Sequence, residues 1–185
     1  VKVVEIGNEW WLQWGGGVSR SDKLKKYVKI AQNIAEHIAN NFPNRSFKLL
    51  VNGDYTQPSE FTTMKNHFTK AYDEIDGVDL HASAGYDSTE KHMSDLGWRI
   101  EACADNFNSS KDMYIYISEW SPSKGLNDDK KYMEAANIIP DMVHIYARAG
   151  VDAACYWPPV NPGAAGLGLV ASDCTSVLPC GQILG

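Results

Sequence analysis

Residues 1–9, with the sequence VKVVEIGNE, decide the fold. The first six form an apolar run interrupted only by two charged residues, which is typical of a β-strand buried inside a sheet. Gly7 ends the run, and the polar pair Asn8 and Glu9 follows at once. The sequence therefore predicts a buried strand that presents polar groups at its carboxyl end.

Beyond this strand, the chain alternates short apolar strands with amphipathic helices. Residues 21–42 place apolar side chains at three- and four-residue steps, which predicts a helix that Ser21 caps and Pro43 ends. Four more strands are expected, at residues 47–51, 78–81, 113–118 and 151–157. Three more helices are expected, at residues 58–75, 88–107 and 128–149, the last kinked at Pro140.

This order is a strand–helix unit repeated four times and followed by a final strand. It predicts an α/β fold with parallel strands and right-handed crossovers, formed by a single domain over residues 1–185. A closed (β/α)8 barrel usually takes about 250 residues and rarely fewer than about 200. The chain has 185 residues, so a complete barrel is not expected. Periodicity alone allows either a flavodoxin-like open sheet or part of a barrel.

Composition excludes several classes of function. Apolar residues make up 44% of the chain and charged residues 22%, which indicates a folded globular domain. The net charge is −6 and no basic stripe occurs, so a nucleic-acid partner is not expected. No segment approaches the roughly 20 apolar residues of a membrane helix. The cysteine and histidine spacings match no zinc motif, and neither a metal nor a cofactor is predicted.

The first residue and the cysteines bear on processing and location. The chain opens on Val1, inside an expected strand, which favours processing or truncation. Cys174 and Cys180 lie six residues apart in a loop that contains proline, and their spacing permits either a small disulfide ring or free thiols. A bridge would agree with a secreted, extracellular protein, which is the location we expect.

Residues suited to carbohydrate chemistry follow several of the predicted strands. Functional groups of parallel α/β folds gather at the carboxyl ends of the strands. Asn52 and Asp54, after the second strand, are interpreted as loop formers. The candidates at the other strand ends are Glu9, Trp10, His81, Glu119, Trp120 and Trp157. Paired carboxylates flanked by aromatic rings are what glycoside hydrolysis requires, because one acid protonates the leaving oxygen and the other attacks the anomeric carbon.

Two of these strand ends resemble motifs of the clan A glycoside hydrolases. Residues 5–9, EIGNE, resemble the acid/base motif that closes barrel strand four, and residues 117–120, ISEW, resemble the nucleophile motif of strand seven. Two strand–helix units lie between them, as strands five and six require. Trp157 matches a tryptophan at the end of strand eight, and residues 166–171, GLGLVA, resemble the stretch that follows. The resemblance implies half of a TIM barrel, with five strands and four helices.

The resemblance also implies roles for the polar residues. Glu119 would be the nucleophile and Glu9 the general acid/base of a retaining double displacement, with their carboxyls about 5–5.5 Å apart. Asn8 would hydrogen-bond the sugar 2-hydroxyl beside the nucleophile. The substrate would be a β-linked oligo- or polysaccharide, such as a galactan or a β-glucan.

Further substrate contacts follow from the same resemblance. His81 matches the strand-six histidine of several member families, which often place a tyrosine two residues later. This chain has Ser83 there, and Tyr86 is the candidate substitute. The aromatic side chains expected to bind sugar are Trp10, Trp120 and Trp157.

Two alternatives to an enzyme stay open from the residues alone. The chain can be a non-catalytic half-barrel module that binds carbohydrate through its aromatic rim, or a flavodoxin-like domain in which the glutamates are solvated strand-end acids. Asn8 is also suited to a turn, and His81 to the core. Because half a barrel leaves strand edges unpaired, we expect either a homo-oligomer or a missing N-terminal half-barrel.

Overall fold

The computed structural model describes residues 2–85, 90–122, 132–160 and 168–185. These residues form a five-stranded parallel sheet with the strand order β1-β2-β3-β4-β5. The strands are β1 (Lys2–Ile6), β2 (Phe47–Gly53), β3 (Gly77–His81), β4 (Tyr114–Trp120) and β5 (Ala153–Tyr156). The α-helices are α1 (Arg20–Asn41), α2 (Ser59–His67), α3 (Glu90–Asn108), α4 (Tyr132–Arg148) and α5 (Pro179–Leu184).

The strand order separates the two architectures that periodicity left open. Each strand neighbours the next one along the chain, which is the order of a (β/α) barrel. A flavodoxin-like sheet has the order 2-1-3-4-5, because its chain reverses direction across the sheet. The prediction of an α/β fold with the five parallel strands of half a TIM barrel is therefore confirmed.

The chain forms two compact units. The first contains Val1–Leu80 and Arg99–Tyr116, and the second contains His81–Trp98 and Ile117–Gly185. Strands β3 and β4 each run from the first unit into the second. The first unit therefore holds the carboxyl ends of β1 and β2, and the second holds those of β3, β4 and β5.

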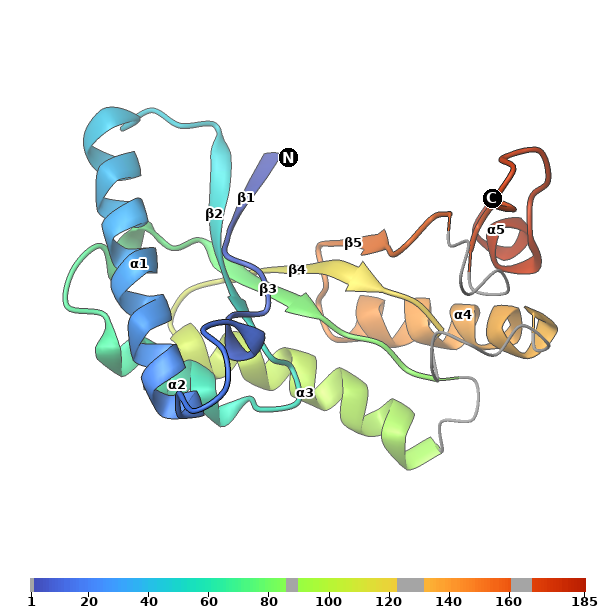
Figure 1. Ribbon diagram of the computed structural model, residues 1–185, viewed down its shortest axis with the longest axis horizontal. Coiled ribbons are helices and arrows are strands. Elements are labelled where there is room, and N and C mark those ends of the chain that lie inside the picture. Colours follow the sequence, from blue (N-terminus) through green and yellow to red (C-terminus); the bar gives the residue numbers. More distant parts are fainter. Residues whose placement is uncertain (1, 86–89, 123–131, 161–167) are drawn as a thin grey trace. The chain divides into compact units, whose positions relative to one another are not determined.

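In the first unit, α1 covers β1 and β2. Its buried face consists of Leu24, Tyr27, Val28, Ala31 and Ala35. Figure 1 shows β1 and β2 lying side by side, with α1 beside them. The helix begins two residues earlier than a cap at Ser21 implies, because Ser19 is its N-cap and the Ser19 Oγ accepts a hydrogen bond from the Asp22 N–H at 3.1 Å.

The second helix is shorter than the sequence predicts. It ends at His67, and a separate 3₁₀ turn follows at Tyr72–Glu74. Ala71 has a φ of 54°, a left-handed conformation that an α-helix cannot contain. Aromatic packing favours this break, since the Tyr72 ring lies 5.2 Å from that of Phe107 and its hydroxyl donates to the Phe107 carbonyl at 2.6 Å.

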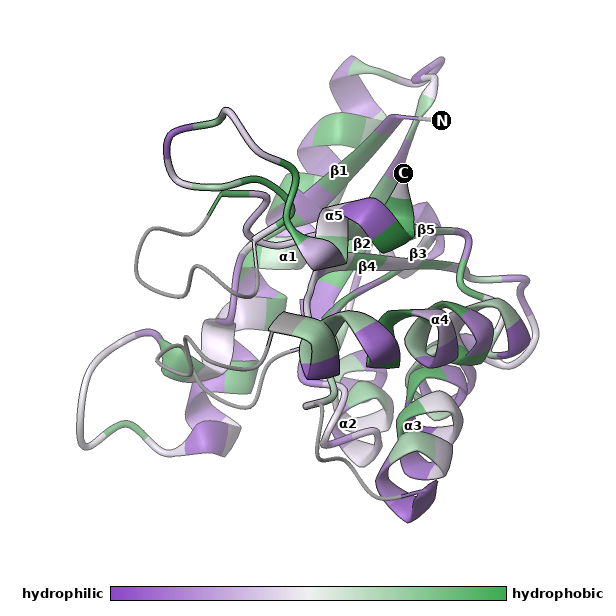
Figure 2. Ribbon diagram, turned by 90° about the vertical axis from the view of Figure 1, so that its right-hand side faces the viewer, coloured by the Kyte–Doolittle hydropathy of each residue, from purple (hydrophilic) through white to green (hydrophobic). Residues whose placement is uncertain are grey.

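In the second unit, α4 contains Pro140, as expected, and buries one apolar face. In Figure 2, α3 and α4 carry both hydrophobic and hydrophilic colours around their turns, which agrees with helices that have one apolar side. The predicted start of α4, near residue 128, lies outside the described residues. No helix in the described part of the chain is long and apolar enough to cross a membrane.

The C-terminal segment, residues 168–185, follows the last strand of the sheet. It contains the short helix α5, which begins with Pro179 at its first position and buries Cys180. Val170 forms isolated bridges with Val160 and Val177. Cys174 and Cys180 form no disulfide in this structure.

Candidate active site

In the first unit, the candidate acid/base Glu9 occupies a strained turn directly after β1. Gly7 has a φ of 84°, and Glu9 itself adopts the left-handed conformation, with φ 44° and ψ 51°. That conformation costs a non-glycine residue about 1–2 kcal/mol. Two hydrogen bonds hold the turn: the Glu9 N–H donates to Asn52 Oδ1 at 2.8 Å, and the Glu9 carbonyl accepts from the Leu12 N–H at 2.8 Å.

Asn52 is the centre of the hydrogen bonds around this turn. It has no solvent-exposed surface, although the sequence suggests only a loop former. Its main-chain N–H donates to the Tyr27 hydroxyl at 2.7 Å, and its carbonyl accepts from Trp10 Nε1 at 3.1 Å. Its Nδ2 donates to Asp79 Oδ2 at 2.6 Å. With the Glu9 contact, all four of its polar groups are satisfied.

The structure buries Trp10, which the sequence places among the sugar-binding residues. Only 1% of its surface is exposed, and its indole stacks on Tyr27 with ring centroids 5.7 Å apart. No ring face is free for a sugar in this conformation, so we assign Trp10 to support of the turn. In the same segment, Trp14 is 38% exposed and Asn8 is exposed.

Arg20 joins the start of α1 to the loop after β2. Its guanidinium lies over the rings of Trp10 and Trp11, 5.6 and 5.9 Å from their centroids. It also pairs with Asp54 at 2.7 Å and with Glu60 at 2.5 Å. The hydrogen bond to Glu60 contributes most to raising the pKa of Arg20, which is charged at any working pH. These contacts support the Trp10 side of the turn.

In the second unit, the candidate nucleophile Glu119 lies near the end of β4, beside His81. The carboxylate Oε2 is 3.6 Å from His81 Nδ1, and the two side chains are 35% and 10% exposed respectively. The main chain holds this pair in register, because the Ala82 N–H donates to the Glu119 carbonyl at 3.2 Å. A partly exposed carboxylate at a strand end is accessible to an incoming electrophile.

Ser83 occupies the position, two residues after His81, at which the resemblance predicts a tyrosine. Its Oγ accepts a hydrogen bond from the Ser121 N–H at 3.2 Å, so it ties the segment after β3 to the segment after β4. Tyr86, the candidate substitute, lies outside the described residues.

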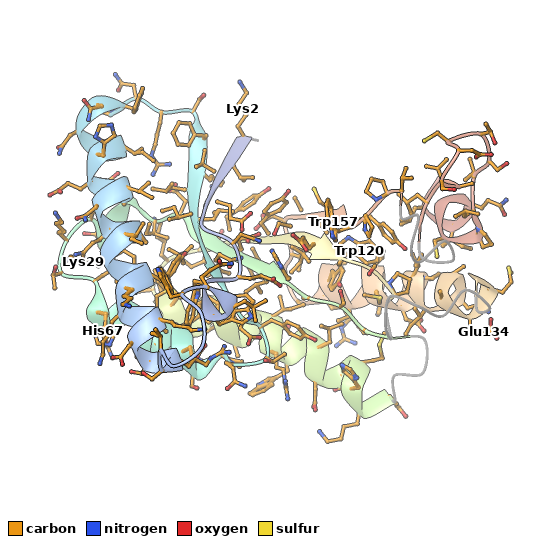
Figure 3. The ribbon with its side chains drawn as sticks, in the orientation of Figure 1. Lys2, Lys29, His67, Trp120, Glu134 and Trp157 are labelled. Atoms are coloured by element: carbon orange, nitrogen blue, oxygen red, sulfur yellow. The ribbon has the colours of Figure 1, made fainter. Side chains whose placement is uncertain are left out.

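The two tryptophans of the second unit have different environments. Trp120 is 5% exposed and packs edge-on against Tyr146 and Tyr156, at 5.4 and 5.0 Å. Trp157 is 55% exposed, and its main-chain N–H donates to the Trp120 carbonyl at 2.9 Å. Figure 3 shows the two side chains close together, from the ends of β4 and β5. Trp157 therefore offers a free ring face that Trp120 does not.

The predicted residues form two groups, one in each unit. Asn8, Glu9 and Trp10 lie in the first unit, whereas His81, Glu119, Trp120 and Trp157 lie in the second. The distance between the Glu9 and Glu119 carboxyls stays a prediction. The sequence analysis interpreted Asn52 only as a loop former and missed its hydrogen bonds. Its position at the end of a buried strand is the signal from which they could have been expected.

Comparison with known proteins identifies the fold. No protein-family model and no curated protein matches the chain. It is similar to an α-L-arabinofuranosidase from Thermotoga maritima, solved as an arabinose complex, with 16% identity and a TM-score of 0.65 over 97% of this chain and 38% of that one. A structure of fungal β-1,4-galactanases is similar at 15% identity and a TM-score of 0.68, over 97% of this chain and 60% of that one.

An endo-laminarinase from Formosa is also similar, with 12% identity and a TM-score of 0.56 over 92% of this chain and 55% of that one. These likenesses, together with the strand order, define the class by fold: part of a (β/α)8 barrel. The chain spans between 38% and 60% of the length of these three proteins.

Proposed function

We propose that the chain is the catalytic half of a retaining glycoside hydrolase that cleaves a β-linked polysaccharide. The observation that carries the proposal is that two glutamates, each followed by tryptophan, lie at or directly after the carboxyl ends of two strands of a parallel sheet. Active sites of (β/α)8 enzymes are built at the carboxyl ends of the strands. The fold of the three similar glycosidases supports the same class of chemistry.

In the proposed mechanism, the Glu119 carboxylate attacks the anomeric carbon while Glu9 protonates the departing glycosidic oxygen. The carbon–oxygen bond to the leaving sugar breaks, and an ester forms between Glu119 and the retained sugar. Glu9, now ionised, takes a proton from water, and the water oxygen displaces Glu119 at the anomeric carbon. His81 orients the nucleophile, Asn8 contacts the 2-hydroxyl, and Trp157 stacks on a sugar ring.

A second barrel half is part of the proposal. Strands β1 and β5 are the ends of the sheet order, and Val4 on β1 is 39% exposed. An apolar edge strand pairs readily with another chain or segment. Either an N-terminal half-barrel or a second copy of this chain would cover it.

The test is reducing-sugar release from β-1,4-galactan, laminarin and other β-glucans by the full natural protein. We expect Glu119→Gln to abolish turnover, and Glu9→Gln to reduce it about 10²–10⁴-fold, the usual contribution of a positioned general acid. Glu36→Gln is the matched control, because Glu36 is a partly exposed glutamate of the first unit that pairs with Lys70 and has no role at the Glu9 turn.

The alternative function is a binding module without turnover, and the exposed face of Trp157 favours it specifically. Calorimetric titration with galactan and laminarin oligosaccharides distinguishes the two. Binding without product release would select the module and rule out the enzyme. Turnover unaffected by both glutamate substitutions would remove Glu9 and Glu119 from the mechanism.

A further inference from the structure

We infer that Asn52 is a positioning residue for Glu9, whose buried side-chain amide holds the left-handed turn that presents the acid/base carboxyl. The inference rests on the proposed function for the role of Glu9, but the contact that carries it does not. The Glu9 N–H donates to Asn52 Oδ1 at 2.8 Å, between residues 43 positions apart in the chain. Asn52 has no exposed surface, so no water replaces this acceptor in the folded state.

The orientation of the Asn52 amide is determined by its second partner. Nδ2 donates to Asp79 Oδ2 at 2.6 Å, and Asp79 is completely buried. The other carboxylate oxygen of Asp79 has no hydrogen-bond partner within the described residues, so the amide is a donor this buried acid needs. A flipped amide would set an oxygen against this carboxylate and Nδ2 against the Glu9 N–H. Asp79 therefore forces Oδ1 toward Glu9.

The main chain of Asn52 is held independently of its side chain. The Tyr27 hydroxyl accepts from the Asn52 N–H at 2.7 Å, and Trp10 Nε1 donates to the Asn52 carbonyl at 3.1 Å. Substitution of the side chain leaves both contacts in place. An Asn52 variant therefore removes the acceptor of the Glu9 N–H and the donor to Asp79, while the end of β2 keeps its anchors.

The strained conformation of Glu9 explains why this acceptor matters. A glutamate at φ 44° and ψ 51° lies in a region that is unfavourable for residues other than glycine, and the hydrogen bond from its N–H to Asn52 offsets much of that cost. Without the bond, the turn relaxes and the carboxyl moves away from the leaving oxygen. General acid catalysis requires the proton donor within hydrogen-bond reach, so the acid step is the one that suffers.

The experiment compares Asn52→Ala and the wild type in the full natural protein by two measurements. The first is amide hydrogen exchange of Glu9 by NMR, which does not depend on activity. We expect its protection to be lost in Asn52→Ala. Leu49→Ala is the matched control, because Leu49 lies on the same strand and is equally buried. This truncation leaves a cavity in the core and lowers global stability. After correction for stability, the Glu9 amide should stay protected in this control.

The second measurement is the dependence of kcat/KM on the leaving group, with phenyl and dinitrophenyl β-galactosides and β-glucosides as probes. A phenol of low acidity needs protonation as it departs, whereas dinitrophenol does not. We expect Asn52→Ala to lower the phenyl rate about 100-fold and the dinitrophenyl rate less than about tenfold. Mere loss of folded protein lowers both rates equally, as Leu49→Ala should.

The outcomes separate the inference from the proposed function. Unchanged protection of the Glu9 amide in Asn52→Ala overturns the inference, whatever the activity. Lost protection with equal losses on both leaving groups also overturns it, because Asn52 is then structural only. If the wild type cleaves no glycoside, the proposed function fails, and exchange of the Glu9 amide alone decides whether Asn52 holds the turn.

Discussion

At the scale of single residues, exposure separates the tryptophan that can meet a sugar from those that support the strands. Trp10 and Trp120 are 1% and 5% exposed, whereas Trp157 is 55% exposed. All three were expected to bind substrate because each lies at or just beyond a strand end. A side chain at a strand end can point either toward solvent or toward neighbouring elements. Which of the two it does depends on the packing of those neighbours. Trp157 is therefore the aromatic residue that we expect to contact carbohydrate.

Substitution of Trp157 by alanine tests this assignment. Because the ring is exposed, we expect the free energy of unfolding to change by no more than about 0.5 kcal/mol. Oligosaccharide affinity should fall about tenfold, since burying one apolar sugar face is worth on the order of 1–2 kcal/mol. Isothermal titration and urea unfolding measure the two effects.

Trp120→Ala is the matched control for this prediction. Its ring is buried against Tyr146 and Tyr156, so its loss should cost about 3–5 kcal/mol of stability. If Trp157→Ala destabilised the fold as much as Trp120→Ala and left affinity unchanged, Trp157 would be a packing residue.

At the scale of elements, one hydroxyl joins α1 to both of the first two strands. Tyr27 is buried, donates to the Ile6 carbonyl at 2.7 Å and accepts from the Asn52 N–H at 2.7 Å. Its ring also lies 3.0 Å from the position that a Cβ on Gly7 would occupy, so a larger residue at Gly7 would meet it. The carboxyl ends of β1 and β2, where the Glu9 turn begins, therefore depend on α1.

Tyr27→Phe should destabilise the protein by about 1–3 kcal/mol, because it leaves a buried carbonyl and a buried N–H without their partner. Tyr72→Phe is the control, since the Tyr72 hydroxyl makes a single bond, to the Phe107 carbonyl, at a partly buried position. Its loss of stability should be smaller. Urea unfolding with circular dichroism gives both values, and equal losses would contradict the bridging role of Tyr27.

Burial also makes the contribution of Tyr27 depend on pH. Desolvation raises the pKa of Tyr27 far above the ordinary value of about 10 for tyrosine. A group whose pKa is raised by folding contributes stability below its unfolded pKa and loses it as the pH rises beyond that value. We therefore expect the free energy of unfolding to fall as the pH rises above about 10, and to keep falling while the folded phenol stays protonated.

In Tyr27→Phe, the free energy of unfolding should fall less steeply with rising pH, because the variant lacks the buried phenol that must stay protonated. Urea unfolding at a series of alkaline pH values gives the slope. A wild type and a variant with the same slope would show that Tyr27 does not titrate on unfolding.

At the scale of the whole molecule, the exposed edge of β1 predicts association. Half a barrel leaves its end strands without neighbours, and proteins rarely leave a flat apolar edge strand open. We expect the 185-residue chain to sediment as a species larger than its 20.5 kDa monomer when no other barrel half is present. Val4→Lys should weaken this association, because charge on an edge strand opposes pairing.

Ile30→Lys is the matched control for Val4→Lys. Ile30 is 48% exposed on α1, whereas Val4 is 39% exposed on the edge strand. If both variants shift sedimentation equally, general surface hydrophobicity drives association. A heat-stable monomer would contradict the prediction and show that the edge needs no partner.

Local patterns determined the elements of this protein, because a strand or helix is specified by the spacing of apolar residues within it. The five strands follow from apolar runs such as residues 1–6, and α1 follows from its three- and four-residue steps. Its cap was missed by two residues, although Ser19 and Asp22 have the spacing of a capping pair. The break after α2 was missed because Ala71 carries no signal for a left-handed turn; the aromatic packing of Tyr72 on Phe107 favours it.

By itself, the sequence determined the class of fold and the two candidate glutamates, since strand ends and their motifs are read from neighbouring residues. Only the tertiary structure decided the order of the strands, the burial of Trp10 and the hydrogen bonds of Asn52. The acceptor of the Glu9 N–H belongs to Asn52, 43 positions away in the chain. A local sequence pattern does not predict contacts between residues so far apart. Hydrogen bonds between strands depend on how the chain packs, and packing is a property of the whole unit.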